Sequence, residues 1–306
     1  MRIGVNAALW GQGSDPLEEW YLRNLMAKTM ALQPSAKFVV FTSKANDDAF
    51  WDFERVRVDD VSMVGRLFRA SVHPLASVIA KVGIDYLFTS INAPIIKTDV
   101  PCVLYALDLH QVEAHANKTD RAAQRIIKTV KETTSSSRAV VALSDYVRDT
   151  LQKTVGVPMD RIKVAPAGLD DLPAEEQSPF IDPPYILITG GTTDTNNVRS
   201  ALEGFRRLRD EIPHTLVVHG PVGRHEPADW GDRVLRVERC PAAHLAALYQ
   251  HCAVCVCPAQ YDGAGLCVLR ALHSGARVVA GRVGGVPAAA GNAPIYCNPE
   301  SDASIA

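Results

Sequence analysis

YDGAGLCVLRALHSG, residues 261–275, combines a glycine turn with a helical pattern of apolar residues. Leucine recurs every third residue after the turn, and Gly275 is a typical helix stop. An apolar run at 253–257 precedes the stretch and a strand-like segment at 277–280 follows it, so the pattern predicts a strand, a turn, a helix and a second, parallel strand. Amides at the start of such a helix favour a phosphate or carboxylate. The alternative is an ordinary βαβ unit whose glycines only turn the chain, because short glycine patterns are weak evidence.

The composition of the 306-residue chain is that of a globular protein long enough for two domains. Hydrophobic residues make up 47%, charged residues 22%, and the net charge is −2. Without a basic stripe, nucleic acid is not the expected partner. The longest apolar runs have the length of strands, and the amino terminus reads as a strand, so we expect no transmembrane segment and no signal peptide.

The seven cysteines are odd in number and lie mostly in apolar runs. This usage indicates reduced, buried thiols and a cytoplasmic protein. Cys252, Cys255 and Cys257 beside His251 suggest a metal site as an alternative. However, Cys255 and Cys257 share one face of a predicted strand and no second ligand pair follows at a suitable spacing, so we expect no metal site.

Strand-length and helix-length patterns alternate in both halves of the chain, which predicts an α/β fold. A stretch rich in proline and acidic residues, 167–184, reads as a linker. We therefore expect two Rossmann-like domains, residues 1–168 and 169–306, that face each other across a cleft.

Candidate site residues follow several of the predicted strands. Asp108 and His110 lie just past the strand at 102–107, where open α/β sheets place ligands. Gly190 and Gly191 follow the strand at 185–189 and permit close approach of a ligand to the backbone. We interpret His219 and Ser144 as structural residues. The sequence shows no convincing Ser/His/Asp triad, so a hydrolase function has little support.

Taken together, these segments resemble family 4 retaining glycosyltransferases of the GT-B fold, over nearly the whole chain. The motifs that carry the resemblance are Ser144 with its following helix, Gly156-Val157-Pro158, Pro166-Ala167-Gly168-Leu169-Asp170, the strand and turn of 185–198, Asp262-Gly263-Ala264-Gly265-Leu266, Gly284-Gly285-Val286-Pro287 and Ile295-Tyr296-Cys297-Asn298-Pro299.

The resemblance implies a donor site in the C-terminal domain. Gly263, Gly265 and Leu266 would receive the diphosphate of a nucleotide sugar, and Asp262 would contact the sugar. The acceptor would lie against the N-terminal domain, with His110 as a candidate for binding it. Asp262 and Asp108 are the two candidates for catalytic residues. The family's reaction needs neither a bound metal nor a cofactor beyond the nucleotide-sugar substrate.

Several departures from the family pattern fall on this chemistry. Arg270 replaces the second acid of the donor motif, and a guanidinium cannot accept hydrogen bonds from ribose hydroxyls. Asn196 replaces an expected lysine, and residues 14–19 replace an expected glycine-rich loop. The chain ends at Ala306, roughly where the family continues for several helices. Arg270 would then supply to the diphosphate the charge that Asn196 does not; a surface arginine without a ligand is the alternative.

Two functions stay open from the sequence. The first is a transferase that moves a hexose from a nucleotide sugar to a saccharide, lipid or small-molecule acceptor with retention, as in polysaccharide biosynthesis, with peripheral membrane contact left open. The second is a GT-B-shaped scaffold without activity, which the altered motif positions favour.

Overall fold

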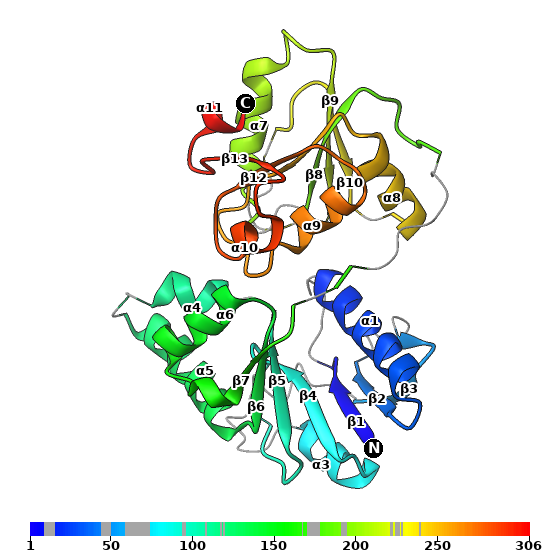
Figure 1. Cartoon of the computed structure of the whole chain (residues 1–306), viewed down its shortest axis with the longest axis vertical. Helices are drawn as coiled ribbons and strands as arrows, with labels where there is room; N and C mark the ends of the chain where they lie inside the picture. The colour runs from blue at the N-terminus through cyan, green and yellow to red at the C-terminus, as the bar shows by residue number, and fades with distance from the viewer. Residues whose placement is uncertain are drawn as a thin grey trace. The chain divides into compact units, whose positions relative to one another are not determined.

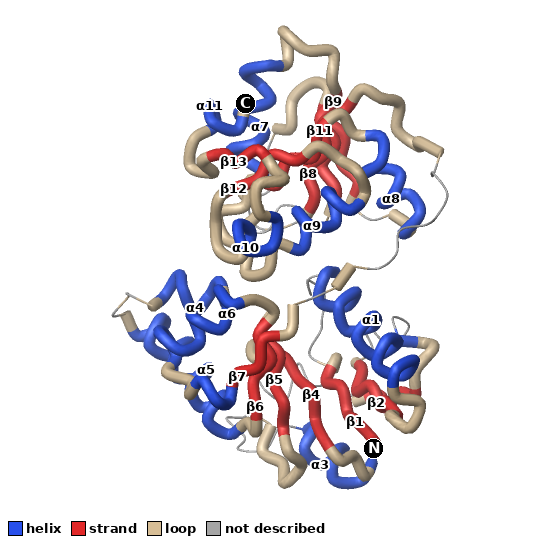
Figure 2. The backbone as a smooth tube through the Cα atoms, in the orientation of Figure 1, coloured by secondary structure: helices blue, strands red, loops and turns tan. Residues whose placement is uncertain are grey.

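The structure is a computed structural model that describes residues 1–8, 16–43, 50–58, 74–93, 96–107, 109–116, 118, 120–166, 168–169, 178–190, 195–220, 223, 227, 229–238 and 240–306. The chain divides into two compact units, Met1–Pro166 and Ala167–Ala306 (Figure 1). Each unit has a parallel sheet with helices packed around it, so the α/β class predicted from the sequence is confirmed (Figure 2). The expected cleft between the domains stays a prediction.

The N-terminal unit is built on a seven-stranded sheet in the order β3-β2-β1-β4-β5-β6-β7. Every neighbouring pair of these strands is parallel, and the order reverses direction between β1 and β4. The strands are β1 (Arg2–Asn6), β2 (Lys37–Thr42), β3 (Glu54–Arg57), β4 (Tyr86–Ser90), β5 (Cys102–Ala106), β6 (Ala139–Ala142) and β7 (Ile162–Val164).

The described helices of this unit begin and end largely where local chemistry predicts. Pro16 opens α1, and the Ser144 hydroxyl caps α6 by accepting a hydrogen bond from the Val147 amide at 3.1 Å. Gly156, at φ 82°, ends the π-helical turn after α6. The helices are α1 (Pro16–Leu32), α3 (Pro74–Val82), α4 (His110–His115), α5 (Arg121–Ser136) and α6 (Asp145–Thr150), with a π turn η2 (Leu151–Val155) and a 3₁₀ turn η3 (Met159–Arg161).

The C-terminal unit has a six-stranded sheet in the order β10-β9-β8-β11-β12-β13, again with every neighbouring pair parallel. Its strands are β8 (Tyr185–Thr189), β9 (Thr215–His219), β10 (Val234–Val237), β11 (Val254–Cys257), β12 (Val278–Gly281) and β13 (Ile295–Cys297). Its described helices are α7 (Val198–Leu208), α8 (Ala242–His251), α9 (Leu266–His273), α10 (Val286–Ala290) and α11 (Asp302–Ile305).

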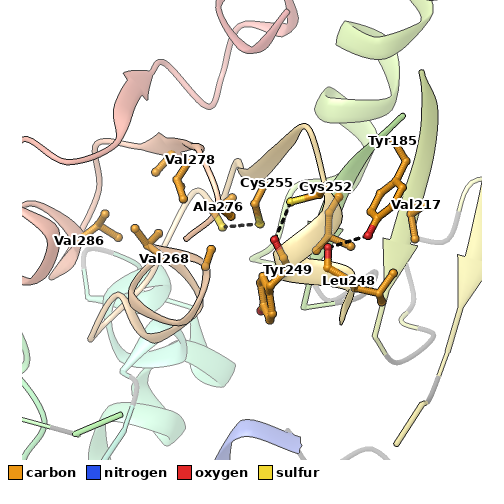
Figure 3. Packing of buried hydrophobic residues seen from close by; sticks show 14 residues of the cluster. Tyr185, Val217, Leu248, Tyr249, Cys252, Cys255, Val268, Ala276, Val278 and Val286 are labelled. Atoms are coloured by element: carbon orange, nitrogen blue, oxygen red, sulfur yellow. Dashed lines mark hydrogen bonds between the residues drawn. The ribbon is translucent and has the colours of Figure 1, made fainter. Parts of the chain in front are cut away.

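Alternating side chains bury both faces of the C-terminal sheet. Cys255 and Cys257 join one cluster with α8 and α9, whereas Val256 between them joins the cluster of α7 and α11 on the other face. Tyr185 crosses the first cluster, and its hydroxyl donates to the Leu248 carbonyl at 2.9 Å (Figure 3). The predicted strand-turn-helix-strand at residues 253–280 is therefore the centre of this core.

Candidate functional site

The order of strands in the C-terminal sheet changes direction between β8 and β11. In open parallel sheets a ligand binds outside the carboxyl ends of the strands at such a point, because the loops diverge to opposite faces. Here the loops after β8 and β11 also touch each other. The Gln260 amide donates to the Thr195 carbonyl at 2.9 Å, and the Asn197 side chain donates to the Pro258 carbonyl at 3.1 Å. The two motif loops predicted from the sequence thus form one edge.

Gly190 ends β8 in a backbone conformation that favours glycine, at φ 102°. The side-chain amide of Asn196 donates to the Gly190 carbonyl and lies over this glycine. A Cβ atom at residue 190 would come within 2.6 Å of that amide. The Asn196 side chain therefore stabilises the turn after β8. Gly191, the second glycine predicted there, lies outside the described residues.

Asn197 is a structural residue of this edge that the sequence reasoning missed. It has a left-handed conformation, φ 55°, and its side chain donates to the carbonyls of Pro258 and, at 2.5 Å, Pro299. Its side-chain oxygen accepts from the Ser200 hydroxyl at 2.8 Å. A signal was available, because asparagine is among the few residues that tolerate this conformation after a strand.

Asp262 is turned toward its own loop. One carboxylate oxygen accepts from the amide of Ala264 at 3.0 Å and from the amide of Gly265 at 2.6 Å. Such an Asx-type turn explains why an aspartate precedes this glycine. The carboxylate thus holds the amide of Gly265, one of the residues that the family resemblance assigned to the diphosphate. Whether Asp262 also contacts a sugar stays a prediction.

Gly265 has φ 70°, and α9 starts at the next residue, Leu266, as the sequence predicts. A Cβ atom at residue 265 would meet the Ala289 side chain at 3.1 Å. The N-terminus of α9 carries partial positive charge from its first amides. Leu266 is buried, so this residue can offer a ligand its backbone but not its side chain.

A second glycine pair, Gly284 and Gly285, fits against the turn from the loop after β12. A Cβ atom at residue 284 would lie 2.0 Å from the Asp262 carbonyl oxygen, and one at residue 285 would lie 2.3 Å from that of Gly263. The Gly285 amide also donates to the Asp262 carbonyl at 2.8 Å. Only glycine fits at this approach, which fixes the backbone of the predicted donor turn.

Basic side chains gather at the same edge of the sheet. Arg236, on β10, donates to the Val218 carbonyl at 2.8 Å and to the Gly220 carbonyl at 3.3 Å, on either side of His219. Burial of the ring, with the nearby charges of Arg270 and Arg236, lowers the pKa of His219 to about 4. The charge of Arg270 thus acts on the histidine at the end of β9, which was interpreted from the sequence as structural.

In the N-terminal unit, His110 is the first residue of α4 and is partly buried. Asp108 lies outside the described residues. Helix α4 is fixed by Glu113, whose carboxylate accepts from the Tyr146 hydroxyl at 2.6 Å and the Thr150 hydroxyl at 2.9 Å. His110 belongs to the N-terminal unit, whereas the donor-site candidates belong to the C-terminal unit. A site that the two units share stays a prediction.

The cysteines are free thiols buried or half-buried in the described structure. The sulfur atoms of Cys255 and Cys257 lie 3.9 Å apart on one face of β11, as the sequence predicts. Hydrogen bonding to Cys257 and burial raise the pKa of Cys255 well above its usual value. Among the described residues, no helix has the length and apolar character that a membrane span needs.

Comparison with known proteins agrees with this geometry. Residues 183–306 match the family described as Glycosyl transferases group 1. O-antigen chain mannosyltransferase B of Escherichia coli is 24% identical over 192 residues, which cover 56% of this chain and 50% of the relative. The chain thus spans about half the length of the curated relative it matches.

Solved structures resemble the whole chain in fold. A sucrose-phosphate synthase from Thermosynechococcus elongatus has a TM-score of 0.69 at 17% identity, with 100% of this chain and 88% of that chain covered. Anabaena Alr3699/HepE, in complex with UDP and glucose, has a TM-score of 0.65 at 12% identity, with 100% and 88% covered. The two-sheet architecture is that of GT-B glycosyltransferases, as predicted.

Proposed function

We propose that this chain, a GT-B protein whose residues 183–306 belong to the glycosyl transferases group 1, transfers a hexose from a nucleotide sugar to a saccharide or lipid acceptor with retention of configuration. The donor binds at the carboxyl edge of the C-terminal sheet. The acceptor binds the N-terminal unit, where His110 and Asp108 are the candidates. The protein acts in the cytoplasm, and no cofactor beyond the donor is required.

One observation carries the proposal: the two motif loops of the matched family meet at the point where the strand order reverses. The hydrogen bond from the Gln260 amide to the Thr195 carbonyl links the segment after β8 to the segment that leads into the turn before α9. This is where a nucleotide diphosphate reaches helix amides in a parallel α/β sheet. The relatives support the choice of substrate, because one is a mannosyltransferase and another binds UDP and glucose.

The leaving group is a nucleoside diphosphate, so the main chemical task is to stabilise its negative charge. The amides at the N-terminus of α9 and the guanidinium of Arg270 serve this task without a metal ion. Asp262 holds the turn in shape by accepting hydrogen bonds from the amides of Ala264 and Gly265, and we assign its carboxylate to the sugar as well. Departure of the diphosphate and attack by the acceptor hydroxyl then occur on the same face of the sugar.

The test is a donor panel followed by a product assay. The full chain is titrated with UDP, GDP and their glucose, mannose and galactose derivatives. Slow hydrolysis of each donor is measured from the nucleoside diphosphate that is released. The donor that binds is then offered lipid and saccharide acceptors, and the anomeric configuration of the product is read by NMR. Saturable binding with turnover supports the transferase, whereas a folded protein that binds none of the panel would support the scaffold alternative.

The control variant is Lys128→Ala, because Lys128 is an exposed residue of α5 whose contact with Glu132 is a surface ion pair at 3.7 Å. Asp262→Asn keeps an acceptor oxygen for the two turn amides but removes the charge. We expect it to bind the nucleotide diphosphate at least as tightly as the parent and to transfer sugar more slowly.

A further inference from the structure

We propose that the exposed face of α5, with the end of α4 beside it, docks the protein on an anionic membrane surface. The cations of this docking face are Lys118, Arg121, Arg125 and Lys131. The inference goes beyond the proposed function, because it concerns a surface of the N-terminal unit and no step of sugar transfer. Burial, charge and a hollow in the surface distinguish the docking face from the packed side of the helix.

Helix α5 buries one side against α4 and the N-terminal sheet. Its buried residues include Ala123, Val130 and Thr134, whose spacing places them on one face of the helix. Val130 belongs to one hydrophobic cluster with Val112 of α4 and Val140 of β6, and α5 lies beside α4 (Figure 1). The apolar side of the helix is therefore occupied by the core of the unit, and the opposite side is the one that a partner can reach.

This opposite side is basic. Arg121, Arg125 and Lys131 are exposed on α5, and Lys118 is exposed just before the helix begins. Within the described part of the chain, none of these four side chains forms an ion pair. Their ammonium and guanidinium groups can therefore approach lipid phosphates without breaking an ion pair within the protein.

The charge of this stretch is opposite in sign to that of the rest of the chain. Residues 118–132 contain five basic and two acidic side chains, a local charge of +3, whereas the whole chain carries −2, so the remaining residues carry −5. Such a separation of charge orients a protein toward an anionic surface. The whole-chain charge did not reveal a basic stripe, because these residues become neighbours only when the helix forms.

The two acids of the stretch have partners of their own. The Asp120 carboxylate accepts from the Ala123 amide at 2.9 Å and so caps the start of α5. Glu132 contacts Lys128 at 3.7 Å, one turn apart on the exposed side. These two charges offset each other, and neither residue is counted in the docking face.

A hollow of about 320 Å³ lies between α5 and the end of α4. Lys118 and Lys131 line it together with His115 and the half-buried side chain of Ile127. Ile127 also packs against the hydrophobic cluster beneath, which fixes its position. Ammonium groups around a small apolar surface match a lipid headgroup region, where phosphates lie over the start of the acyl chains.

Lipid fits this face better than nucleic acid does. Residues 109–138 contain no Phe, Tyr or Trp on which a base could stack. Basic side chains alone are sufficient at a membrane, because each one near an anionic surface strengthens attachment about fivefold. Four of them give an attachment that is reversible and sensitive to salt.

Vesicle co-sedimentation of the full chain measures the docking. Vesicles of phosphatidylcholine with about one third phosphatidylglycerol should bind the protein at least about tenfold more tightly than vesicles of phosphatidylcholine alone. Raising the salt from about 0.1 M to about 0.5 M should release the protein, because screening shortens the range of the attraction. Equal binding to both kinds of vesicle, or binding to neither, would overturn the proposal.

Acetylation by an amine-reactive reagent, with mass spectrometry of each site, identifies the face that touches the vesicle. Bound vesicles should protect Lys118 and Lys131 from labelling. Lys28 of α1 and Lys163 of β7, which are exposed on other elements of the same unit, should react as fast as they do without vesicles. Protection that does not favour Lys118 and Lys131 over this pair would refute the assignment.

A double variant tests the charges directly. Arg121→Gln with Arg125→Gln removes two exposed charges from the docking face and should weaken vesicle binding about tenfold or more. The matched control is Lys28→Gln with Lys163→Gln, which lowers the net charge equally and should change binding about twofold at most. An equal loss in both double variants would show that net charge alone attaches the protein, and the docking face would be wrong.

Nucleic acid and soluble phosphate are the competing occupants. Glycerol phosphate at the same ionic strength should leave the protein on the vesicle, whereas displacement would assign the hollow to a soluble phosphate. A single-stranded RNA of about 20 nucleotides should protect Lys118 and Lys131 less well than vesicles of equal phosphate concentration. Better protection by the RNA would make the face a nucleic-acid site and overturn the membrane proposal.

Failure of the docking face and failure of the proposed transferase are distinguishable. Docking needs no donor, so Asp262→Asn should bind vesicles as the parent does. Turnover of a nucleotide sugar with a water-soluble acceptor, together with no vesicle binding, supports the transferase and refutes the docking face. Vesicle binding that protects Lys118 and Lys131, together with no donor turnover, supports the docking face and refutes the transferase.

Discussion

Replacing His219 by glutamine should remove a pH-dependent part of the stability of the C-terminal unit. Burial and the charges of Arg270 and Arg236 lower the pKa of His219 from 6.5 to about 4 in the folded protein. The unfolded chain therefore binds a proton in this interval that the folded chain does not. The contribution is fully present above about pH 6.5 and is lost as the pH falls toward 4.

The size of the effect follows from the difference between the two pKa values. At about 1.4 kcal/mol per pKa unit, the complete loss is about 3 kcal/mol, and at pH 5 it is about 2 kcal/mol. Partial exposure of the ring makes both figures upper values. In the His219→Gln variant, the side chain is neutral in both states, so this component disappears while the other titrating groups of the chain remain.

Native-state hydrogen exchange measures this in the full chain. The amides of β8, β9 and β11 report the free energy of opening of the C-terminal core, provided that intrinsic exchange rates are corrected at each pH. We expect the parent to lose stability relative to His219→Gln between pH 7.5 and pH 5, and Arg270→Gln to lose less than the parent. A constant difference between the parent and His219→Gln over this range would refute the reasoning.

Other predictions concern the backbone and the thiols of the same unit. Gly285→Ala should destabilise the unit by about 2 kcal/mol or more in urea unfolding, because its Cβ would meet a carbonyl oxygen at 2.3 Å, whereas Gly168→Ala, with open space around it, should change stability by less than about 0.5 kcal/mol. Asn197→Ala should cost about 2 kcal/mol, since two loop carbonyls lose their donor, and Asn197→Gly should recover the part that comes from backbone strain. Cys255 should resist alkylation at pH 8 until the protein unfolds, whereas the half-buried Cys240 reacts earlier; labelling followed by mass spectrometry distinguishes them.

The sequence predicted the elements that have a strong pattern. The strand, glycine turn and helix around Gly265 appear as expected, because apolar alternation, a left-handed glycine and helical spacing agree with one another there. Segments with weaker signals were misjudged. Helices α3 and α4 were not predicted. Helix α5 continues to Ser136 through threonines and serines whose hydroxyls donate to carbonyls one turn earlier.

For the site, the sequence identified which residues are present but not where their side chains point. The sequence analysis noted only that Asn196 lacks the positive charge of the expected lysine, whereas the structure shows that its side-chain amide donates to the Gly190 carbonyl. Asp262 was assigned to a sugar, yet one of its oxygens holds the turn. The link from Arg270 to His219 joins α9 to β9 across 51 positions of sequence, and no local pattern encodes such a distant pairing.

The glycine pair at 284 and 285 has a consequence for how this fold can change over time. It supports the neighbouring turn through main-chain atoms alone, by touching the carbonyls of residues 262 and 263. The shape of that turn is therefore insensitive to which side chains project from the helix behind it. Residue 270 can therefore be an arginine in place of an acid, which changes the side chain near a ligand, while the backbone of the turn keeps its conformation.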